Sequence, residues 1–184
     1  MLDRLLKIRM FTQFMALLAL GAFAATALIA MSSLSLRGRQ FWAHNLGPGA
    51  LVAAAAVAVV TMGGSLYLSE GLHYRPCRLC WVQRGFAYPL ALLLPAAILL
   101  RRPRLQQIAL PLAGLGSLVS VYHIMIEHFP SLEGSATCDP ANPCSLVWVR
   151  HFGFVTIPTM ALASFLLQIT LALIATAHLR KERS

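Results

Sequence analysis

Charged side chains are scarce in this sequence: they make up 11% of its 184 residues, and only 6 of them are acidic. A soluble domain of this length normally carries about 25% charged residues. Hydrophobic residues reach 58% and are grouped in blocks, several of which contain the ~20 residues needed to cross a bilayer. The composition therefore excludes a soluble domain and predicts an integral membrane protein.

Alternation of polar and apolar residues is also missing, which excludes the strands of a membrane β-barrel. The sequence has no internal repeat and no charged pair deep in the apolar blocks, so a transporter or a channel has little support. Five continuous apolar blocks remain, each long enough to span as a helix: residues 11–31, 49–69, 81–100, 105–126 and 152–179. We predict an all-α membrane protein, with a four-helix transmembrane bundle in residues 37–184 and an additional N-terminal apolar helix in residues 1–36.

The net charge of +9 is high enough to suggest a nucleic-acid partner. The basic residues, however, form no amphipathic face and lie in clusters between the blocks, as the positive-inside rule describes. The clusters are Arg4, Lys7 and Arg9; Arg37 and Arg39; Arg101, Arg102 and Arg104; and Arg180, Lys181 and Arg183. We therefore expect membrane lipid, and no nucleic acid, as a partner.

The last three clusters fall on one side of the membrane, predicted to be the cytoplasm, if the last four blocks all span. Residues 70–80 and 127–151, which contain all four cysteines, then face outward, where a bacterial compartment is oxidising and disulfides persist. The first block fits less well, because a spanning helix there places its basic cluster outside. Three interpretations stay open, with a helix expected in each: an extra span, a signal-like segment, or residues upstream of a true start at Met31.

Cysteines are few but closely paired, and four of them allow two disulfides or a four-thiolate metal site. Cys77 and Cys80 form a C-x-x-C motif where an outer loop enters a predicted helix. The helix N-terminus, and Arg84 one turn further on, would favour a thiolate at Cys80. Arg84 is either an arginine that snorkels to the headgroups or a cation that serves a thiolate or a polar ligand head.

Cys138 and Cys144 enclose a short loop that contains Pro140 and Pro143. A disulfide across this loop would contribute only ~2–2.5 kcal/mol in the chain-entropy model. Such a bridge is either a structural staple or, when exposed, labile and catalytic. The C-x5-C spacing is unusual for a zinc knuckle, so we expect no metal. A structural four-cysteine zinc site, or purely structural disulfides, is the alternative to a redox function.

Two runs of sequence resemble the DsbB family of disulfide bond formation proteins. Residues 77–89, CRLCWVQRGFAYP, resemble its signature, and residues 148–158, WVRHFGFVTIP, resemble the start of its last helix. The resemblance covers about residues 37–180 and fits a short-loop branch, whereas block 11–31 has no counterpart in the usual four-helix family. A vitamin K epoxide reductase-like enzyme is less similar, because there the loop pair precedes the C-x-x-C motif.

The resemblance implies a thiol:quinone oxidoreductase of the bacterial inner membrane, with both cysteine pairs on the periplasmic side. A reduced DsbA-like thioredoxin-fold protein would attack the Cys138–Cys144 disulfide at Cys138. The released thiolate would reduce Cys77–Cys80 by exchange. Cys80 would then pass electrons to a quinone, ubiquinone or menaquinone, held near Arg84.

Two histidines flank the outer end of the fourth block. Either His123 or His128 could hydrogen-bond a quinone oxygen or handle its proton. His123 is the better candidate because it lies inside the apolar run, although an interfacial polar role is open to both. Trp81 belongs to an aromatic belt at the outer interface and is a further candidate for contact with the quinone.

Overall fold

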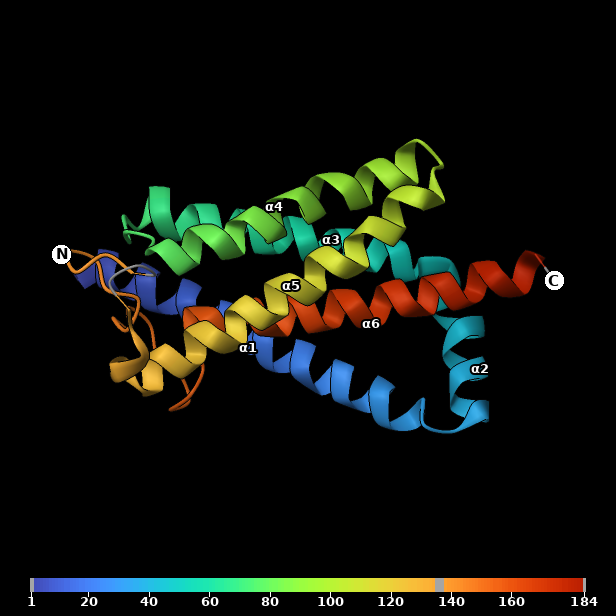
Figure 1. Cartoon of the computed structure of the whole chain (residues 1–184), viewed down its shortest axis with the longest axis horizontal. Coiled ribbons are helices and arrows are strands. Elements are labelled where there is room, and N and C mark those ends of the chain that lie inside the picture. The colour runs from blue at the N-terminus through green and yellow to red at the C-terminus, as the bar shows by residue number, and fades with distance from the viewer. Residues whose placement is uncertain (1, 135–137, 184) are drawn as a thin grey trace.

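The chain folds into long helices connected by short segments (Figure 1). The computed structural model describes residues 2–134 and 138–183, and for residues 2–4, 103–104 and 180–183 it describes the backbone alone. In chain order the elements are α1 (Leu2–Ser32), α2 (Leu36–Asn45), α3 (Gly47–Leu66), the π-helical turn η1 (Tyr67–Gly71), α4 (Arg78–Leu99), α5 (Pro103–His128), the 3-10 turn η2 (Pro130–Leu132) and α6 (Ile157–Arg183). The described residues contain no strand, which confirms the predicted all-α class.

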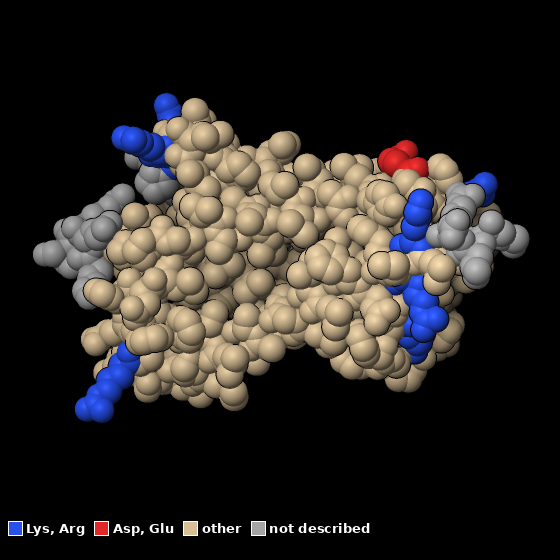
Figure 2. Space-filling view, turned by 180° about the vertical axis from the view of Figure 1, so that it is seen from behind, with Lys and Arg blue, Asp and Glu red and all other residues tan. Residues whose placement is uncertain are grey.

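Among the residues that the structure describes, five segments are long and apolar enough to cross a membrane: Leu5–Ser32, Gly47–Gly71, Arg78–Leu99, Leu105–His128 and Ile157–Leu179. They match the five predicted blocks closely. Figure 2 shows a broad band of uncharged residues with charged side chains at the two ends, as a protein embedded in lipid requires. The chain is a multi-pass membrane protein. Among the basic residues used for the topology prediction, the side chains of Arg4, Arg104, Arg180, Lys181 and Arg183 lie outside the described residues.

The core of the bundle lies between α3, α4, α5 and α6 and depends on small residues. Ala50, Ala54 and Ala58 of α3 are fully or almost fully buried at four-residue spacing, so they form one stripe along the helix. Small side chains let helix backbones approach closely, which is how helices pack in lipid. Phe165 of α6 fills the centre of this core and is completely buried.

Helix α1 lies outside this four-helix core and packs along α6 (Figure 1). Its N-terminus lies at the same end of the molecule as the loops that carry the cysteines. The short helix α2 follows at the opposite end, and no apolar block predicts it. It begins after Ser35, whose Oγ accepts a hydrogen bond from the backbone N–H of Gly38. The first block is thus a helix of full spanning length, which all three interpretations expect.

Helix α6 begins at Ile157, five residues later than the predicted block. The preceding residues form a tight turn in which His151 and Val155 exchange backbone hydrogen bonds of 2.9 Å. Phe152 and Gly153 adopt positive φ angles of 52° and 82° in this turn. A left-handed residue does not continue a right-handed helix, so the helix starts only after the turn.

Candidate functional site

Cys77 and Cys80 lie at the start of α4. Cys77 is the N-cap residue, and its sulfur accepts a hydrogen bond from the backbone N–H of Cys80, with an N–S distance of 3.3 Å. Both thiols are reduced, and their sulfurs lie 2.8 Å apart. Because the cap turns the chain directly into the helix, the two sulfurs are held where a disulfide can form between them.

The surroundings of Cys77 favour its thiolate. A hydrogen bond from the Cys80 thiol, opposed by burial and aided by the hydrogen bond and charge of His123, lowers the pKa of Cys77 to about 5. The His123 Nε2 atom lies 3.6 Å from the Cys77 sulfur. The thiol of Cys80, the ring of His123 and the backbone N–H of Cys80 together favour a thiolate at Cys77, whereas the predicted thiolate at Cys80 stays a prediction. The helix begins at Arg78, so the earlier cysteine occupies the cap position.

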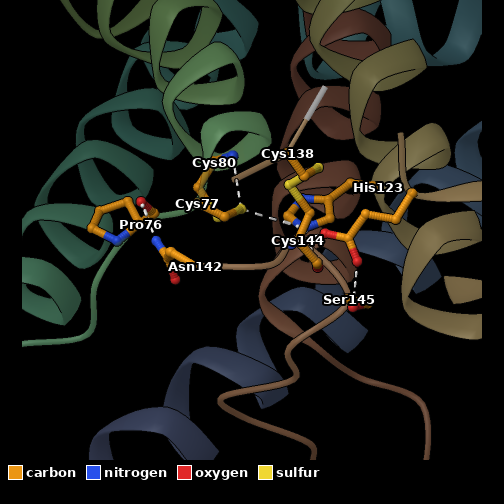
Figure 3. The surroundings of a disulfide bond; sticks show 9 residues. Pro76, Cys77, Cys80, His123, Cys138, Asn142, Cys144 and Ser145 are labelled. Atoms are coloured by element: carbon orange, nitrogen blue, oxygen red, sulfur yellow. Dashed lines mark hydrogen bonds between the residues drawn. A yellow bond between two sulfur atoms is a disulfide. The ribbon is translucent and has the colours of Figure 1, made fainter. Parts of the chain in front are cut away.

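Cys138 and Cys144 form a disulfide in the second outer loop (Figure 3). Glu133 holds the loop from one side, because its carboxylate accepts hydrogen bonds from the Cys144 backbone N–H and from the Ser145 hydroxyl. Asn142 attaches the loop to the first one, donating from Nδ2 to the carbonyl of Pro76 at 3.0 Å. The disulfide loop is thus docked directly against the residue that precedes Cys77.

The two cysteine pairs belong to one buried cluster. Cys77, Cys138 and Cys144 pack with Leu79 of α4 and Ile126 of α5, and Cys80 lies at the edge of this cluster. His123 connects the pairs, since its Nε2 atom also donates to the carbonyl oxygen of Cys144, 3.1 Å away. Figure 3 shows its hydrogen bond to Cys77 and its ring close to the disulfide loop. This placement suits thiol–disulfide exchange, which requires the sulfurs of the two pairs to meet.

Arg84 lies one turn beyond Cys80 and is buried. Its Nε donates to the Ser65 hydroxyl at 2.9 Å and its Nη2 to the Ser65 carbonyl at 2.8 Å. The guanidinium also stands over the rings of Trp81 and Tyr88, with centroid distances of 5.1 and 5.9 Å. No hydrogen bond engages its Nη1 within the described parts of the chain, so a donor remains for a ligand. Arg84 therefore points into the protein and does not snorkel.

A cavity of about 420 Å³ opens beside Arg84, between α1, α3, α4 and α6. Its walls are predominantly apolar, and Cys80, Gln83 and Arg84 contribute polar groups at one end. Cavities of this size and character hold small hydrophobic ligands with a polar head. A second, much smaller cavity is lined by Cys77, His123 and Glu127. Cys80 lines both cavities, whereas Cys77 lines the small one but not the large one.

The other predicted ligand contacts lie in different places. His123 is buried at the sulfurs and lines the small cavity, so it is separate from the walls of the large one. His128 is exposed and donates from Nδ1 to the Ile124 carbonyl of its own helix. Trp81 is 59% exposed and touches the large cavity only through Arg84. A direct contact of His123 or Trp81 with a quinone stays a prediction.

A four-thiolate metal site is not available in this state, because two of the four sulfurs are joined in a disulfide. Among the described residues, Cys77, Cys80 and His123 do bring three potential ligand atoms within 4.8 Å of one another. Three ligands can hold zinc with a fourth from solvent or substrate. The prediction that no metal binds is not tested by this geometry.

The chain matches the model of the family described as disulfide bond formation protein DsbB over residues 48–177. It belongs to the DsbB family. It is 40% identical over 117 residues to disulfide bond formation protein C of Bacillus subtilis strain 168, which covers 64% of this chain and 85% of that protein. A probable disulfide formation protein C 1 of Bacillus anthracis is 37% identical over 117 residues, covering 64% and 84%. No solved structure matches the chain.

Membership of the DsbB family gives the chain a role in disulfide formation, and hence in thiol oxidation. It confirms the resemblance seen in residues 77–89 and 148–158. Helices α1 and α2 precede the matched residues.

Three residues of the site escaped the sequence analysis: Ser65, Glu133 and Asn142. Each contacts a residue from a distant part of the chain or from across a loop. Glu133 was visible only as one of the few acidic residues between the cysteine pairs.

Proposed function

We propose that this DsbB-family protein is a thiol:quinone oxidoreductase of the bacterial inner membrane. It reoxidises a DsbA-like thioredoxin-fold protein on the outer side and passes the electrons to a membrane quinone. One observation carries this proposal: Cys80 lines an apolar cavity beside Arg84, while its partner Cys77 faces the second cysteine pair. The C-x-x-C motif therefore connects a site for exchange with a site for a hydrophobic acceptor.

The exchange steps extend those that the family resemblance implies, and the shared cluster of the two cysteine pairs supports them. A thiolate of the partner attacks Cys138, and Cys144 leaves as a thiolate. Cys144 then attacks Cys77 in the oxidised C-x-x-C pair, and Cys80 leaves toward the large cavity. The second thiolate of the partner attacks the partner sulfur of the mixed disulfide, which closes the partner's disulfide and releases Cys138 as a thiolate. Attack of Cys138 on Cys144 then re-forms the loop disulfide and releases Cys77. Two electrons have then moved from the partner to Cys77 and Cys80, and the partner holds the new disulfide.

The low pKa of Cys77 helps the last of these steps. A thiol with a lower pKa is a better leaving group in thiol–disulfide exchange. Because the pKa of Cys77 is lowered to about 5, it departs as a stable thiolate at neutral pH. The structure itself has a reduced Cys77–Cys80 pair and an oxidised Cys138–Cys144 pair, which is the state that follows this step.

The large cavity fits a quinone in size and chemistry. Its walls accept an apolar ring and tail, and a quinone accepts two electrons and two protons from a dithiol. Arg84 would hold the ring by donating to a quinone oxygen, and its charge stabilises negative charge that develops there. Cys77, whose sulfur is 2.8 Å from that of Cys80, would close the disulfide as the electrons leave.

The experiment is partner-driven quinone reduction. Purified protein is mixed with a reduced DsbA-like protein and with a ubiquinone or menaquinone analogue, and quinone absorbance is followed. Cys80→Ser should abolish turnover. Arg84→Ala should raise the KM for quinone about tenfold or more, because it removes a charged hydrogen-bond donor. Arg39→Ala, an exposed arginine of α2, is the matched control and should behave as wild type.

Folded, oxidised wild-type protein that reduces neither analogue would contradict the proposal. The four cysteines would then be assigned a structural role.

A further inference from the structure

Helix α1 forms one wall of the large cavity. Met15, Leu18, Ala19 and Ala22 line it, at the spacing of one helix face, together with Gly21. These residues lie outside the stretch that matches the DsbB family, residues 48–177. The residues of α3, α4 and α6 that form the opposing walls lie within it. The cavity is therefore shared between the family fold and an element that precedes it.

Helix α1 is held firmly in this position. Thr12 hydrogen-bonds His151 through its Oγ1 at 2.9 Å. The ring of Phe11 packs on Tyr67 with centroids 4.4 Å apart. Ala16 is completely buried in a small core that includes Val155, in the turn before α6. These contacts fix the outer half of α1 against both the turn before α6 and the end of α3.

The cavity has a polar end and an apolar end. The polar end is at Cys80 and Arg84, in the first turns of α4. From there it runs toward the middle of the bundle, because η1 and α3 contribute residues from Leu68 back to Ala56 and α1 contributes residues forward to Ala22. A Cβ atom added at Gly21 would meet no atom within 4 Å, so open space continues beside it. A ligand with its reactive head at Cys80 would therefore extend its apolar part along α1.

From this geometry we infer that α1 is the element of the acceptor site that binds the isoprenoid tail and sets the preference for tail length. The inference rests on the proposed quinone reduction. The tail is the expected occupant because the apolar space along α1 and the polar end at Cys80 belong to one cavity. A quinone ring bound at the polar end would therefore extend its tail along α1. The ring contacts Arg84 and Cys80, whereas the tail contacts Leu18 and Gly21.

Two neighbouring leucines of α1 give a matched test. Leu18 is 43% exposed and lines the cavity, whereas Leu17 is 52% exposed and does not line it. Leu18→Trp should raise the KM for a long-tailed quinone about tenfold, because the larger ring occupies the space of the tail. Its kcat, and its KM for a quinone without a tail, should stay at wild-type values. Leu17→Trp should leave kcat and both KM values at those of the wild type.

A second pair of variants keeps the test valid if one variant misfolds. Gly21→Leu should act like Leu18→Trp, because its side chain enters open cavity space. Ala24→Leu, at an exposed position outside the cavity lining, is its control. Equal KM values for the long-tailed quinone in Leu18→Trp, Gly21→Leu and both controls would overturn the inference.

Photolabelling separates failure of this inference from failure of the proposed function. A long-tailed quinone with a photoreactive group on the tail is irradiated with wild-type protein, and labelled peptides are mapped. Label on residues 15–22, competed by unmodified quinone, is expected. Quinone turnover without such label would sink the tail site alone. Absence of turnover sinks the proposed function, and the label then still decides whether α1 lines an apolar ligand site.

Discussion

Cys77 combines the position of a helix cap with the contacts of a stabilised thiolate. Its sulfur accepts from the Cys80 backbone N–H and lies beside the Cys80 thiol and His123. All of these favour negative charge on sulfur, against the cost of burial. In the proposed reaction the chemistry of the pair is therefore divided: Cys77 would act as the leaving group and resolving thiolate, and Cys80, which lines the large cavity, would face the acceptor.

This division predicts an unusual pH dependence. Because the pKa of Cys77 is lowered from 9.0 to about 5, its thiolate is present above about pH 5. Alkylation of Cys77 in the reduced protein, followed by peptide mass spectrometry, should rise through pH 5 and level off near neutrality. Cys80→Ala should shift the midpoint upward most, and His123→Gln should shift it upward less, in the order of their contributions. A wild-type midpoint near 9 would contradict this account.

At the scale of elements, the disulfide loop is docked on the start of α4 by Asn142. Its amide donates to the Pro76 carbonyl, immediately before Cys77. Asn142→Ala removes a hydrogen bond worth about 1 kcal/mol and should slow electron transfer between the two pairs about fivefold. Rapid mixing with reduced partner protein measures this step. Asn45→Ala, whose amide bonds only within its own helix, should leave the rate unchanged.

Asn142→Ala should leave quinone reduction by a chemically reduced Cys77–Cys80 pair at the wild-type rate. Loss of both steps would show that Asn142 supports the fold and not the docking of the loop.

Helices α5 and α6 meet at a glycine. A Cβ atom at Gly116 would lie 2.5 Å from the buried ring of Phe165, whereas one at Gly114 would meet nothing within 4 Å. Gly116→Ala should therefore destabilise the bundle by about 1–3 kcal/mol, as overpacked cores do. Gly114→Ala should be neutral or slightly stabilising. Thermal unfolding in detergent compares the two, and equal melting temperatures would refute the close contact.

The helices were predictable where composition alone decides them. Apolar blocks give the five spans, because lipid accepts only backbone that is satisfied within the segment. Helix α2 was missed because it is polar, although Ser35 three residues before Gly38 is a capping signal. The start of α6 was placed too early because hydropathy does not register the left-handed turn at Phe152 and Gly153.

The site was predictable as a set of residues but not as an arrangement. The C-x-x-C motif and Arg84 share one helix, so their spacing fixes their neighbourhood. The contact of His123 with Cys77 joins residues 46 positions apart, and the contact of Asn142 with Pro76 joins residues 66 apart. Such distances depend on how helices pack, which no local pattern encodes. For the same reason, α1 could be predicted as a helix but not as a cavity wall.

At the scale of the whole molecule, the N-terminus and both cysteine pairs lie at one end, and α2 with the α4–α5 turn lies at the other (Figure 1). We expect the cysteine end to face outward in the cell. In protein whose native cysteines are replaced by serine, a membrane-impermeant maleimide should label Lys7→Cys in intact spheroplasts. It should label Arg101→Cys only after the membrane is permeabilised. Labelling of Arg101→Cys alone would reverse the topology.

The most direct test of the account is a single turnover without the partner protein. Protein with Cys138→Ser and Cys144→Ser is reduced, freed of reductant and mixed with quinone in the absence of oxygen. Cys77 and Cys80 should lose both thiols as they form a disulfide, with one quinol produced per protein. Thiols that persist beside unreduced quinone, in protein shown to be folded, would contradict the claim that this pair delivers electrons to the cavity at Arg84.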